Sequence, residues 1–303
     1  MPEEPSSAQE RAEKSSRGPG RRGSFLRRLG STLVLWAVVV GTIASSNSIA
    51  YFALVAALAL LSLWEFFRMV ALPGVPGRGR TMLLFSGVYL ALLFRAGHGG
   101  GIEAGSVAVI DSMALVALFV WLLLAEFRFS PEAGGGVSRV VVSLFGFLWI
   151  PFLFGFVLKI LFLPGGGGVY YVLLLTVVTK FTDMGAYITG SLVGRTPFMA
   201  HISPKKTWEG IAGGIGFAVG ASLVMAWLLG EKLPGIAGGR AALIGVILGL
   251  AAVAGDLAES VVKRTWATKD SGQVLPGIGG TLDLIDSVCF TAPLLYFYLI
   301  FTT

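Results

Sequence analysis

Long apolar stretches recur along this chain of 303 residues, and each has about the length that crosses a bilayer as a helix. Because lipid cannot satisfy backbone polar groups, such a chain folds into a bundle of α-helices. Only 13% of the residues are charged, whereas soluble domains carry about 25%. The sequence therefore predicts an all-α polytopic membrane protein. About nine transmembrane helices are expected, over approximately 31–47, 48–70, 81–97, 106–126, 138–162, 169–192, 211–230, 239–259 and 286–303.

Composition divides the chain into three expected parts. Residues 1–30 are rich in Ser, Gly, Pro and Arg, and they are expected to form a disordered basic tail in the cytoplasm. Residues 31–165 are expected to form an N-terminal group of transmembrane helices. Residues 166–303 are expected to form a C-terminal transmembrane region, which carries most of the polar motifs.

Basic residues are distributed unevenly between the loops, which predicts how the helices are oriented in the membrane. With the N-terminus in the cytoplasm, only Arg95, Lys232 and Arg240 of the 23 Lys and Arg residues fall in segments on the outer side. The polar loops after the sixth and the eighth expected helices then both face the cytoplasm. The net charge of +6 comes largely from the N-terminus and from particular loops, so it bears on orientation rather than on nucleic-acid binding.

The most polar stretch runs from Gly255 to Ser287, between two apolar segments. On a helix, Asp256 and Glu259 lie three residues apart and share a face, and Asp283 and Asp286 repeat this spacing. Carboxylate oxygens suit Mg²⁺, which shares the rest of its ligand shell with water and substrate phosphates. The stretch therefore predicts a metal and phosphate site. A solvated, salt-bridged loop is the alternative, but charges at the ends of membrane helices are costly.

A second polar group lies inside the sixth apolar segment, where Lys180 and Asp183 are three residues apart and Tyr187 follows one turn later. An ionisable residue inside a membrane helix costs about 2.5–3.5 kcal/mol on insertion scales, so this pair should face protein or a water-filled cavity. The alternative is a Lys180–Asp183 pair that only joins two helices.

The segment Ser203-Pro204-Lys205-Lys206-Thr207-Trp208-Glu209 has the pattern of a helix start, because a serine precedes a proline of the first turn. Backbone N–H groups, two lysines and two hydroxyls would then converge, which predicts an anion-binding site. The alternative is that Lys205 and Lys206 only set the topology.

Three blocks of the C-terminal region resemble the phosphatidate cytidylyltransferases, or CDP-diacylglycerol synthases. The first two are Asp183-x-x-Ala186-Tyr187-x-x-Gly190 and Ser203-Pro204-Lys205-Lys206-Thr207-x-Glu209-Gly210. The third and most specific block matches at Gly255-Asp256-Leu257, Glu259-Ser260, Lys263-Arg264, Lys269-Asp270, Pro276-Gly277, Gly279-Gly280, Asp283 and Asp286-Ser287. The N-terminal half shows only a general hydrophobic pattern.

The resemblance implies that CTP and phosphatidate are condensed to CDP-diacylglycerol and pyrophosphate in phospholipid biosynthesis. Residues 166–303 would be the catalytic region, with a polar active-site cavity that faces the cytoplasm of a bacterial inner (cell) membrane. Phosphatidate would reach this cavity from the bilayer. The resemblance also implies a homodimer, which nothing in the composition selects.

The resemblance and the chemistry of phosphoryl transfer together give each residue an expected role. Asp256, Asp283 and Asp286 are expected to bind Mg²⁺. Lys205 and Lys206 are expected to neutralise the triphosphate and the transition state. Contacts with the substrates are expected from Asp183, Tyr187, Ser203, Thr207, Glu209, Glu259, Lys263, Arg264, Lys269 and Asp270.

Two positions depart from the family signature. Ile278 stands where the family usually has a histidine, and Leu284 stands where it usually has an arginine. The metal-binding carboxylates are intact, so the departures concern recognition of the lipid headgroup. They keep open a related membrane transferase or kinase that acts on another lipid phosphate or on a polyprenol. An ion-coupled transporter is a further alternative, although its paired halves and broken midplane helices are not evident here.

Overall fold

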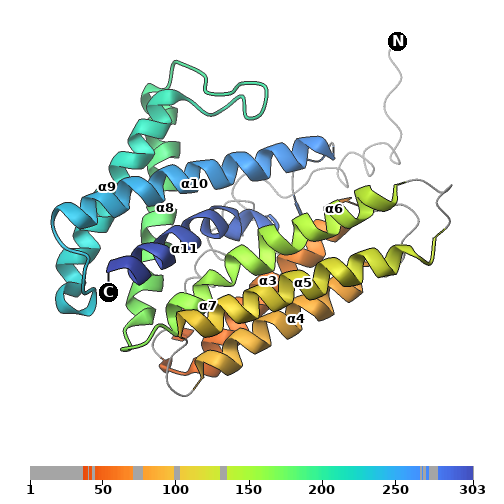
Figure 1. The fold of residues 1–303 in the computed structure, drawn as a ribbon. Coiled ribbons are helices and arrows are strands. Elements are labelled where there is room, and N and C mark those ends of the chain that lie inside the picture. The colour runs from red at the N-terminus through yellow and green to blue at the C-terminus, as the bar shows by residue number, and fades with distance from the viewer. Residues whose placement is uncertain are drawn as a thin grey trace, which may run out of the picture.

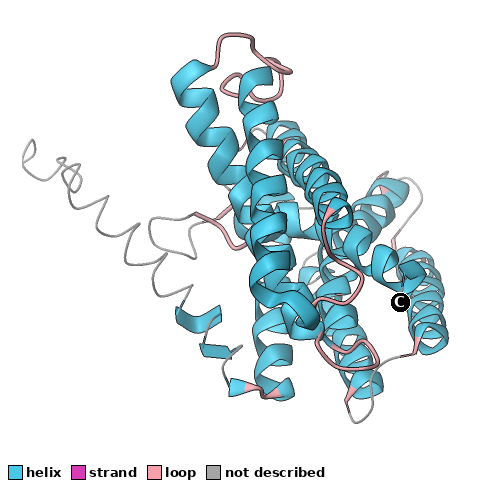
Figure 2. Ribbon diagram, turned by 90° about the vertical axis from the view of Figure 1, so that its left-hand side faces the viewer, coloured by secondary structure: helices cyan, strands magenta, loops and turns pink. Residues whose placement is uncertain are grey.

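The computed structural model describes residues 37–39, 41–42, 45–70, 78–98, 103–129, 135–266, 268, 271–272 and 279–302. Figure 2 shows helices and loops throughout this part of the chain. Eight helical segments within it are long and apolar enough to cross a membrane. The predicted all-α polytopic membrane fold is confirmed. The expected tail 1–30 and most of the first expected span, 31–47, lie outside the described residues.

The helices form two groups, which Figure 1 shows as a bundle of α3 to α7 and a closely packed pair, α8 and α9, that crosses α10. The final helix, α11, packs against members of both groups. The expected boundary at residue 165 falls in the turn before α8, and the division into two regions stays a prediction. The elements are α3 (Ser48–Val70), α4 (Arg78–Gly97), α5 (Ala104–Glu126), α6 (Gly136–Phe147), η2 (Leu148–Phe152), α7 (Phe156–Leu161), α8 (Gly168–Val193), α9 (Trp208–Leu229), η3 (Gly230–Lys232), α10 (Gly239–Thr265) and α11 (Leu282–Thr302).

Local sequence explains where two of these elements begin. The side-chain oxygen of Asn47 accepts a hydrogen bond of 2.9 Å from the backbone N–H of Ile49, which satisfies a free donor at the start of α3. Before α8, Gly165, Gly166 and Gly167 have φ angles of 91°, 75° and 80°. Residues with a β-carbon disfavour this region, so the glycines allow the chain to turn sharply into the next helix.

The fifth expected span, 138–162, is not one uninterrupted α-helix. It consists of α6, a five-residue π-helical turn at Leu148–Phe152, and α7. Pro151 lies inside the π-helical turn, where its missing N–H and its ring disturb the regular hydrogen-bond ladder. The three pieces still form one candidate membrane span, Gly136–Leu161.

A buried ion pair joins helices of the first group. The Lys159 ammonium is fully buried and lies 2.7 Å from Oδ2 of Asp111. The Tyr89 hydroxyl donates to Oδ1 of the same carboxylate at 2.9 Å. The Lys159 nitrogen also lies 3.7 Å from the ring centroid of Phe156. Each charge therefore compensates the desolvation of the other, and neither is replaceable alone.

The substitution Lys159→Met should lower the free energy of unfolding by about 3–5 kcal/mol, because it leaves the Asp111 carboxylate without its counter-charge. The double variant Lys159→Met/Asp111→Asn should recover at least half of that loss, since Asn still accepts from Tyr89. Thermal unfolding of the purified protein in detergent measures both effects. A single variant as stable as the wild type would contradict this assignment.

Candidate active site

A polar cavity of about 510 Å³ lies where α8, α9, α10 and α11 meet. It is the candidate active site, because it collects most of the residues that the sequence motifs single out. Its described lining residues are Thr182, Asp183, Ala186, Tyr187, Gly190, Lys205, Lys206, Thr207, Gly210, Ile211, Val253, Asp256, Glu259, Lys263, Asp283, Asp286 and Ser287.

Three carboxylates crowd together in this cavity. Asp256, Glu259 and Asp286 each place one oxygen within 4.8 Å of the others. Glu259 and Asp286 are buried, with exposed fractions of 2% and 4%. The Oε1 atom of Glu259 has no hydrogen-bond partner among the described residues. Ionised carboxylates this close repel one another, and a divalent cation bound between them relieves that repulsion, so the donor set fits a hard cation such as Mg²⁺.

The close approach of α10 and α11 brings these carboxylates together. A β-carbon at Gly255 would lie only 2.9 Å from Cα of Ser287 and 3.0 Å from the carbonyl oxygen of Asp286. Glycine at this position lets the two helix backbones nearly touch. Asp256 then follows Gly255 on one helix, opposite Asp286 on the other.

Asp283 has a different environment from the three clustered carboxylates. Its Oδ1 lies 3.1 Å from the Lys263 ammonium, and its Oδ2 accepts a hydrogen bond of 2.9 Å from the backbone N–H of Gly280. Lys263 also pairs with Glu259 at 2.8 Å. The structure thus places Glu259, rather than Asp283, in the closest carboxylate group. The metal ligand set predicted from the sequence, Asp256, Asp283 and Asp286, stays a prediction.

The loop between α8 and α9 supplies the lysines, although not in the way the sequence pattern predicts. The expected helix start at Pro204 is wrong, because α9 begins at Trp208. Thr207 has extended backbone angles, and its hydroxyl accepts a 3.1 Å hydrogen bond from the N–H of Gly210. This cap satisfies a free donor of the first turn, so the helix starts after Thr207.

Lys205 and Lys206 therefore precede the helix in an ordered loop. A backbone hydrogen bond of 2.7 Å runs from the N–H of Phe198 to the carbonyl of Lys206, and Figure 1 shows the loop closing the end of the α8–α9 pair. The ammonium of Lys206 lies 2.6 Å from the Asp256 carboxylate. The loop thus brings a cation directly to the carboxylate group.

Glu209 holds the base of this loop. Its Oε2 accepts from the backbone N–H groups of Arg195 and Thr196, each at 3.2 Å, and its Oε1 accepts from the Thr196 hydroxyl at 2.9 Å. Glu209 is not among the described lining residues of the cavity, and neither is Ser203. Their expected contacts with the substrates stay predictions.

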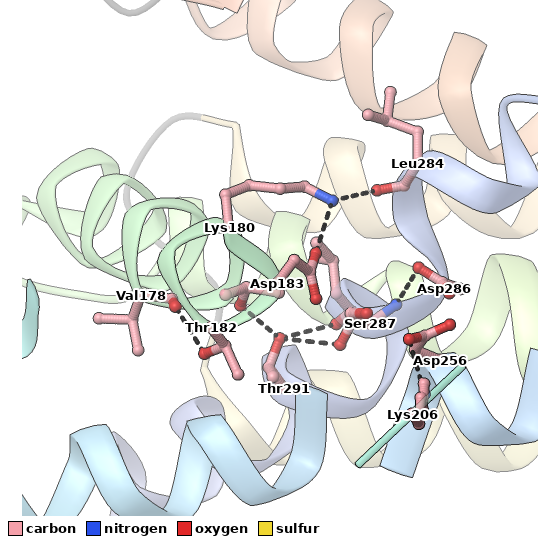
Figure 3. A network of polar contacts seen from close by, with 12 residues as sticks. Val178, Lys180, Thr182, Asp183, Lys206, Asp256, Leu284, Asp286, Ser287 and Thr291 are labelled. Carbon is pink, nitrogen blue, oxygen red and sulfur yellow. Dashed lines mark hydrogen bonds and ion pairs between the residues drawn. The ribbon is translucent and has the colours of Figure 1, made fainter. Parts of the chain in front are cut away.

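Lys180 connects α8 to α11 beside the cavity (Figure 3). Its ammonium donates to the backbone carbonyl of Leu284 at 3.0 Å and lies 3.5 Å from Asp183. Figure 3 places Asp183, Asp256 and Asp286 around the same space. The Lys180–Asp183 pair predicted from the spacing is present. Lys180 also contacts the backbone of Leu284, which stands where the family usually has an arginine.

The remaining predicted residues divide into three cases. Tyr187 lines the cavity and is largely exposed, and its expected contact with the substrates stays a prediction. Arg264 is exposed and is not among the described lining residues. Lys269, Asp270 and Ile278 lie outside the described residues.

Glu65, a buried carboxylate in α3 that contacts the start of α11, was not predicted from the sequence. The available signal was an acidic residue inside the second apolar segment, 48–70, where an unpaired charge is costly. Its partners lie more than 200 residues away along the chain, so no local spacing could identify them.

Comparison with known proteins identifies the family of this chain. Long apolar helices indicate an integral membrane protein, and the buried carboxylates with lysines beside them form a site suited to phosphate chemistry. The model of the cytidylyltransferase family matches residues 26–302. A phosphatidate cytidylyltransferase of Bacillus subtilis is 31% identical over 276 residues, which cover 89% of this chain and 94% of that protein. The chain therefore belongs to the cytidylyltransferase family.

Other relatives match over shorter stretches. A phosphatidate cytidylyltransferase of Mycobacterium bovis is 33% identical over 190 residues, which cover 61% of this chain and 60% of that protein. One from Synechocystis is 46% identical over 118 residues, which cover 39% of each chain. The matched part of this chain thus spans less than two thirds of these two relatives.

Divalent-cation binding should depend on the three clustered carboxylates. Asp256→Asn, Glu259→Gln and Asp286→Asn should each weaken Mn²⁺ binding at least about tenfold, because the amide keeps the shape but loses the charge. Titration followed by electron paramagnetic resonance measures this affinity, with Mn²⁺ in place of Mg²⁺. Glu231→Gln, at the exposed far end of α9, is the matched control and should bind as the wild type does.

The same titration distinguishes the two ligand sets. If Asp283→Asn abolishes binding and Glu259→Gln leaves it unchanged, the ligand set predicted from the sequence is right. Wild-type Mn²⁺ affinity in all four carboxylate variants would show that the cation does not bind in this cavity.

Proposed function

We propose that this protein transfers the cytidylyl group of CTP to phosphatidate and so forms CDP-diacylglycerol. A phosphate oxygen of the lipid attacks the α-phosphorus of CTP, the bond from that phosphorus to the β-phosphate oxygen breaks, and pyrophosphate leaves. The observation that carries the proposal is the group Asp256, Glu259 and Asp286 with Lys206 beside it. These residues fall in the motifs that resemble the phosphatidate cytidylyltransferases, and the match to the B. subtilis relative covers most of the chain.

The site suits a reaction that needs no catalytic base. The attacking phosphate is already an anion, so the main barriers are the mutual repulsion of two anionic substrates and their alignment. Lys205 and Lys206 lie at the cavity and would neutralise phosphate oxygens of CTP as charge develops in the transition state. Lys263 is held between Glu259 and Asp283, where it orients both carboxylates.

A divalent cation is part of the proposal because of the charge balance of the cavity. Five carboxylates and three lysines line its described part, so a triphosphate would meet net repulsion. We propose Mg²⁺ as the cofactor, with Asp256, Glu259 and Asp286 as the residues that would hold it, and Asp283 as the further ligand predicted from the sequence. Bound there, Mg²⁺ would supply charge neutralisation for the phosphates.

We further propose that the cavity faces the cytoplasm of a bacterial inner membrane, where CTP is available. The support is the predicted excess of Lys and Arg on the side of the α8–α9 loop. Tyr187 and its neighbours Met184 and Ile188 on α8 are exposed, which suits contact with lipid at the cavity mouth. The homodimer expected from the family resemblance stays a prediction.

Labelled CTP tests the reaction and separates it from its nearest alternative. Purified protein with phosphatidate, Mg²⁺ and CTP labelled at the α-phosphorus should yield a labelled lipid, because the α-phosphate stays with the product. A lipid or polyprenol kinase would instead transfer label from the γ-phosphorus. Label from neither position, across phosphatidate, several other lipid phosphates and a polyprenol, would refute the enzyme proposal.

The assay also tests the role of the loop lysines. Lys206→Met should lower turnover by at least about a hundredfold, since it removes a cation from the developing charge. Lys232→Met removes the same charge at the opposite end of α9 and should retain wild-type turnover. Equal turnover of Lys206→Met and Lys232→Met would show that Lys206 has no role in the reaction.

Thiol labelling tests the orientation. The single native cysteine, Cys289, is fully buried, so introduced cysteines can be labelled selectively. Ala200→Cys in the α8–α9 loop should react with an impermeant maleimide only from the cytoplasmic face, and Glu231→Cys at the other end of α9 only from the outer face. The reverse pattern would place the cavity on the wrong side of the membrane for CTP.

A further inference from the structure

Glu65 is a buried carboxylate that the proposed reaction does not use. It lies in α3, in the N-terminal group of helices, with an exposed fraction of 1%. A charge at this depth is costly unless something compensates it, so its partners indicate why it is there.

Those partners are at the start of α11. The Oε2 atom of Glu65 accepts a hydrogen bond of 2.9 Å from the Thr281 hydroxyl and another of 2.9 Å from the backbone N–H of Leu282. Leu282 is the first residue of α11, where backbone N–H groups lack partners within the helix and the helix dipole is positive. Glu65 therefore caps α11 from a different helix.

Two described glycines of the α10–α11 loop pack against the same carboxylate. A β-carbon at Gly272 would lie 2.3 Å from Oε1 of Glu65, and a β-carbon at Gly280 would lie 2.7 Å from Oε2. The backbone at these two glycines thus approaches Glu65 so closely that a larger residue at either position would have to displace the Glu65 side chain. Glu65 therefore lies against the loop at these two described positions.

The capped segment carries the carboxylates of the active site. Gly280 donates its backbone N–H to Asp283, which directly follows Leu282. Asp286 lies one turn further along α11, in the cluster with Asp256 and Glu259. A shift of the first turn of α11 would therefore displace both aspartates from their partners.

We propose that Glu65 is a positioning residue: it fixes the first turn of α11, and through that turn it sets the geometry of the carboxylates of the cation site. The N-terminal helices thus contribute to the site without touching the substrates. This inference rests on the proposed cation-dependent function, but it concerns assembly of the site and not the identity of the lipid. Its test is therefore made without CTP or lipid phosphate.

The test compares Glu65→Ala, Glu65→Gln and the wild type by two measurements. Mn²⁺ affinity reports the geometry of the carboxylates, and hydrogen exchange of a peptide covering residues 279–290 reports the order of the first turn of α11. Glu65→Ala should weaken Mn²⁺ binding by at least about tenfold and speed exchange in that peptide. Glu65→Gln should stay within about threefold of the wild type, because its carbonyl oxygen still accepts from Thr281 and Leu282.

Two further variants separate positioning from stability. Lys159→Met destabilises the same group of helices through the pair with Asp111, and it should leave Mn²⁺ affinity at the wild-type value. Thr281→Val removes one of the two hydrogen bonds to Glu65, and it should weaken Mn²⁺ binding in the same direction by about threefold. Thr281→Val keeps the test decisive if Glu65→Ala does not fold.

Folded Glu65→Ala or Thr281→Val protein with wild-type Mn²⁺ affinity would overturn the inference, even if its melting temperature had fallen. Loss of affinity in Lys159→Met as large as in Glu65→Ala would overturn it too, because general destabilisation would then explain both. Failure of the cytidylyl-transfer proposal would be seen in the labelled-CTP assay, where wild-type protein that binds Mn²⁺ would give no labelled lipid.

Discussion

The structure depends on the crowding of three carboxylates where α10 meets α11. Asp256, Glu259 and Asp286 bring oxygens within 4.8 Å of one another, and two of these side chains are buried. Like charges at this distance in a low dielectric repel strongly. The arrangement is tolerable because Lys206 and Lys263 lie against it, at 2.6 Å from Asp256 and 2.8 Å from Glu259. The Oε1 atom of Glu259, which has no hydrogen-bond partner in the described part of the chain, is free to bind a cation.

Three packing features around the cavity position the carboxylates and the lysine of this group. Gly255 lets α10 and α11 approach closely enough for their aspartates to meet. Thr207 ends the α8–α9 loop with a helix cap, so Lys206 reaches across to α10. Glu65, in α3 of the N-terminal group, holds the start of α11 by a hydrogen bond to Leu282. The site thus draws on both groups of helices, although all its predicted residues come from the C-terminal one.

Much of this could be predicted from the sequence because membrane chains carry strong local signals. Apolar length gave the helical class, and the three-residue spacing of Asp256 and Glu259 correctly placed them on one face of a helix. The helix start at Pro204 was mispredicted because a serine–proline pair looks like a cap, whereas the hydrogen bond of Thr207 decides where α9 begins. The interruption at Pro151 was also missed, since hydropathy does not detect a π-helical turn.

Contacts between distant segments lay beyond local patterns. Spacing alone could not rank Glu259 above Asp283 as a neighbour of Asp256, because the choice depends on Lys263 and on the backbone N–H of Gly280. Spacing also could not pair Glu65 with Leu282, because the two residues lie far apart in the chain and no local pattern connects them. Such contacts follow from how the helices pack, and they become visible only in three dimensions.

The most direct test of this account is anomalous X-ray scattering from crystals grown with Mn²⁺ and CTP. The account predicts a strong anomalous peak within coordination distance of Asp256, Glu259 and Asp286, with triphosphate oxygens completing the ligand shell beside Lys206. A peak remote from these three carboxylates, or CTP bound elsewhere with no cation in the cavity, would contradict it.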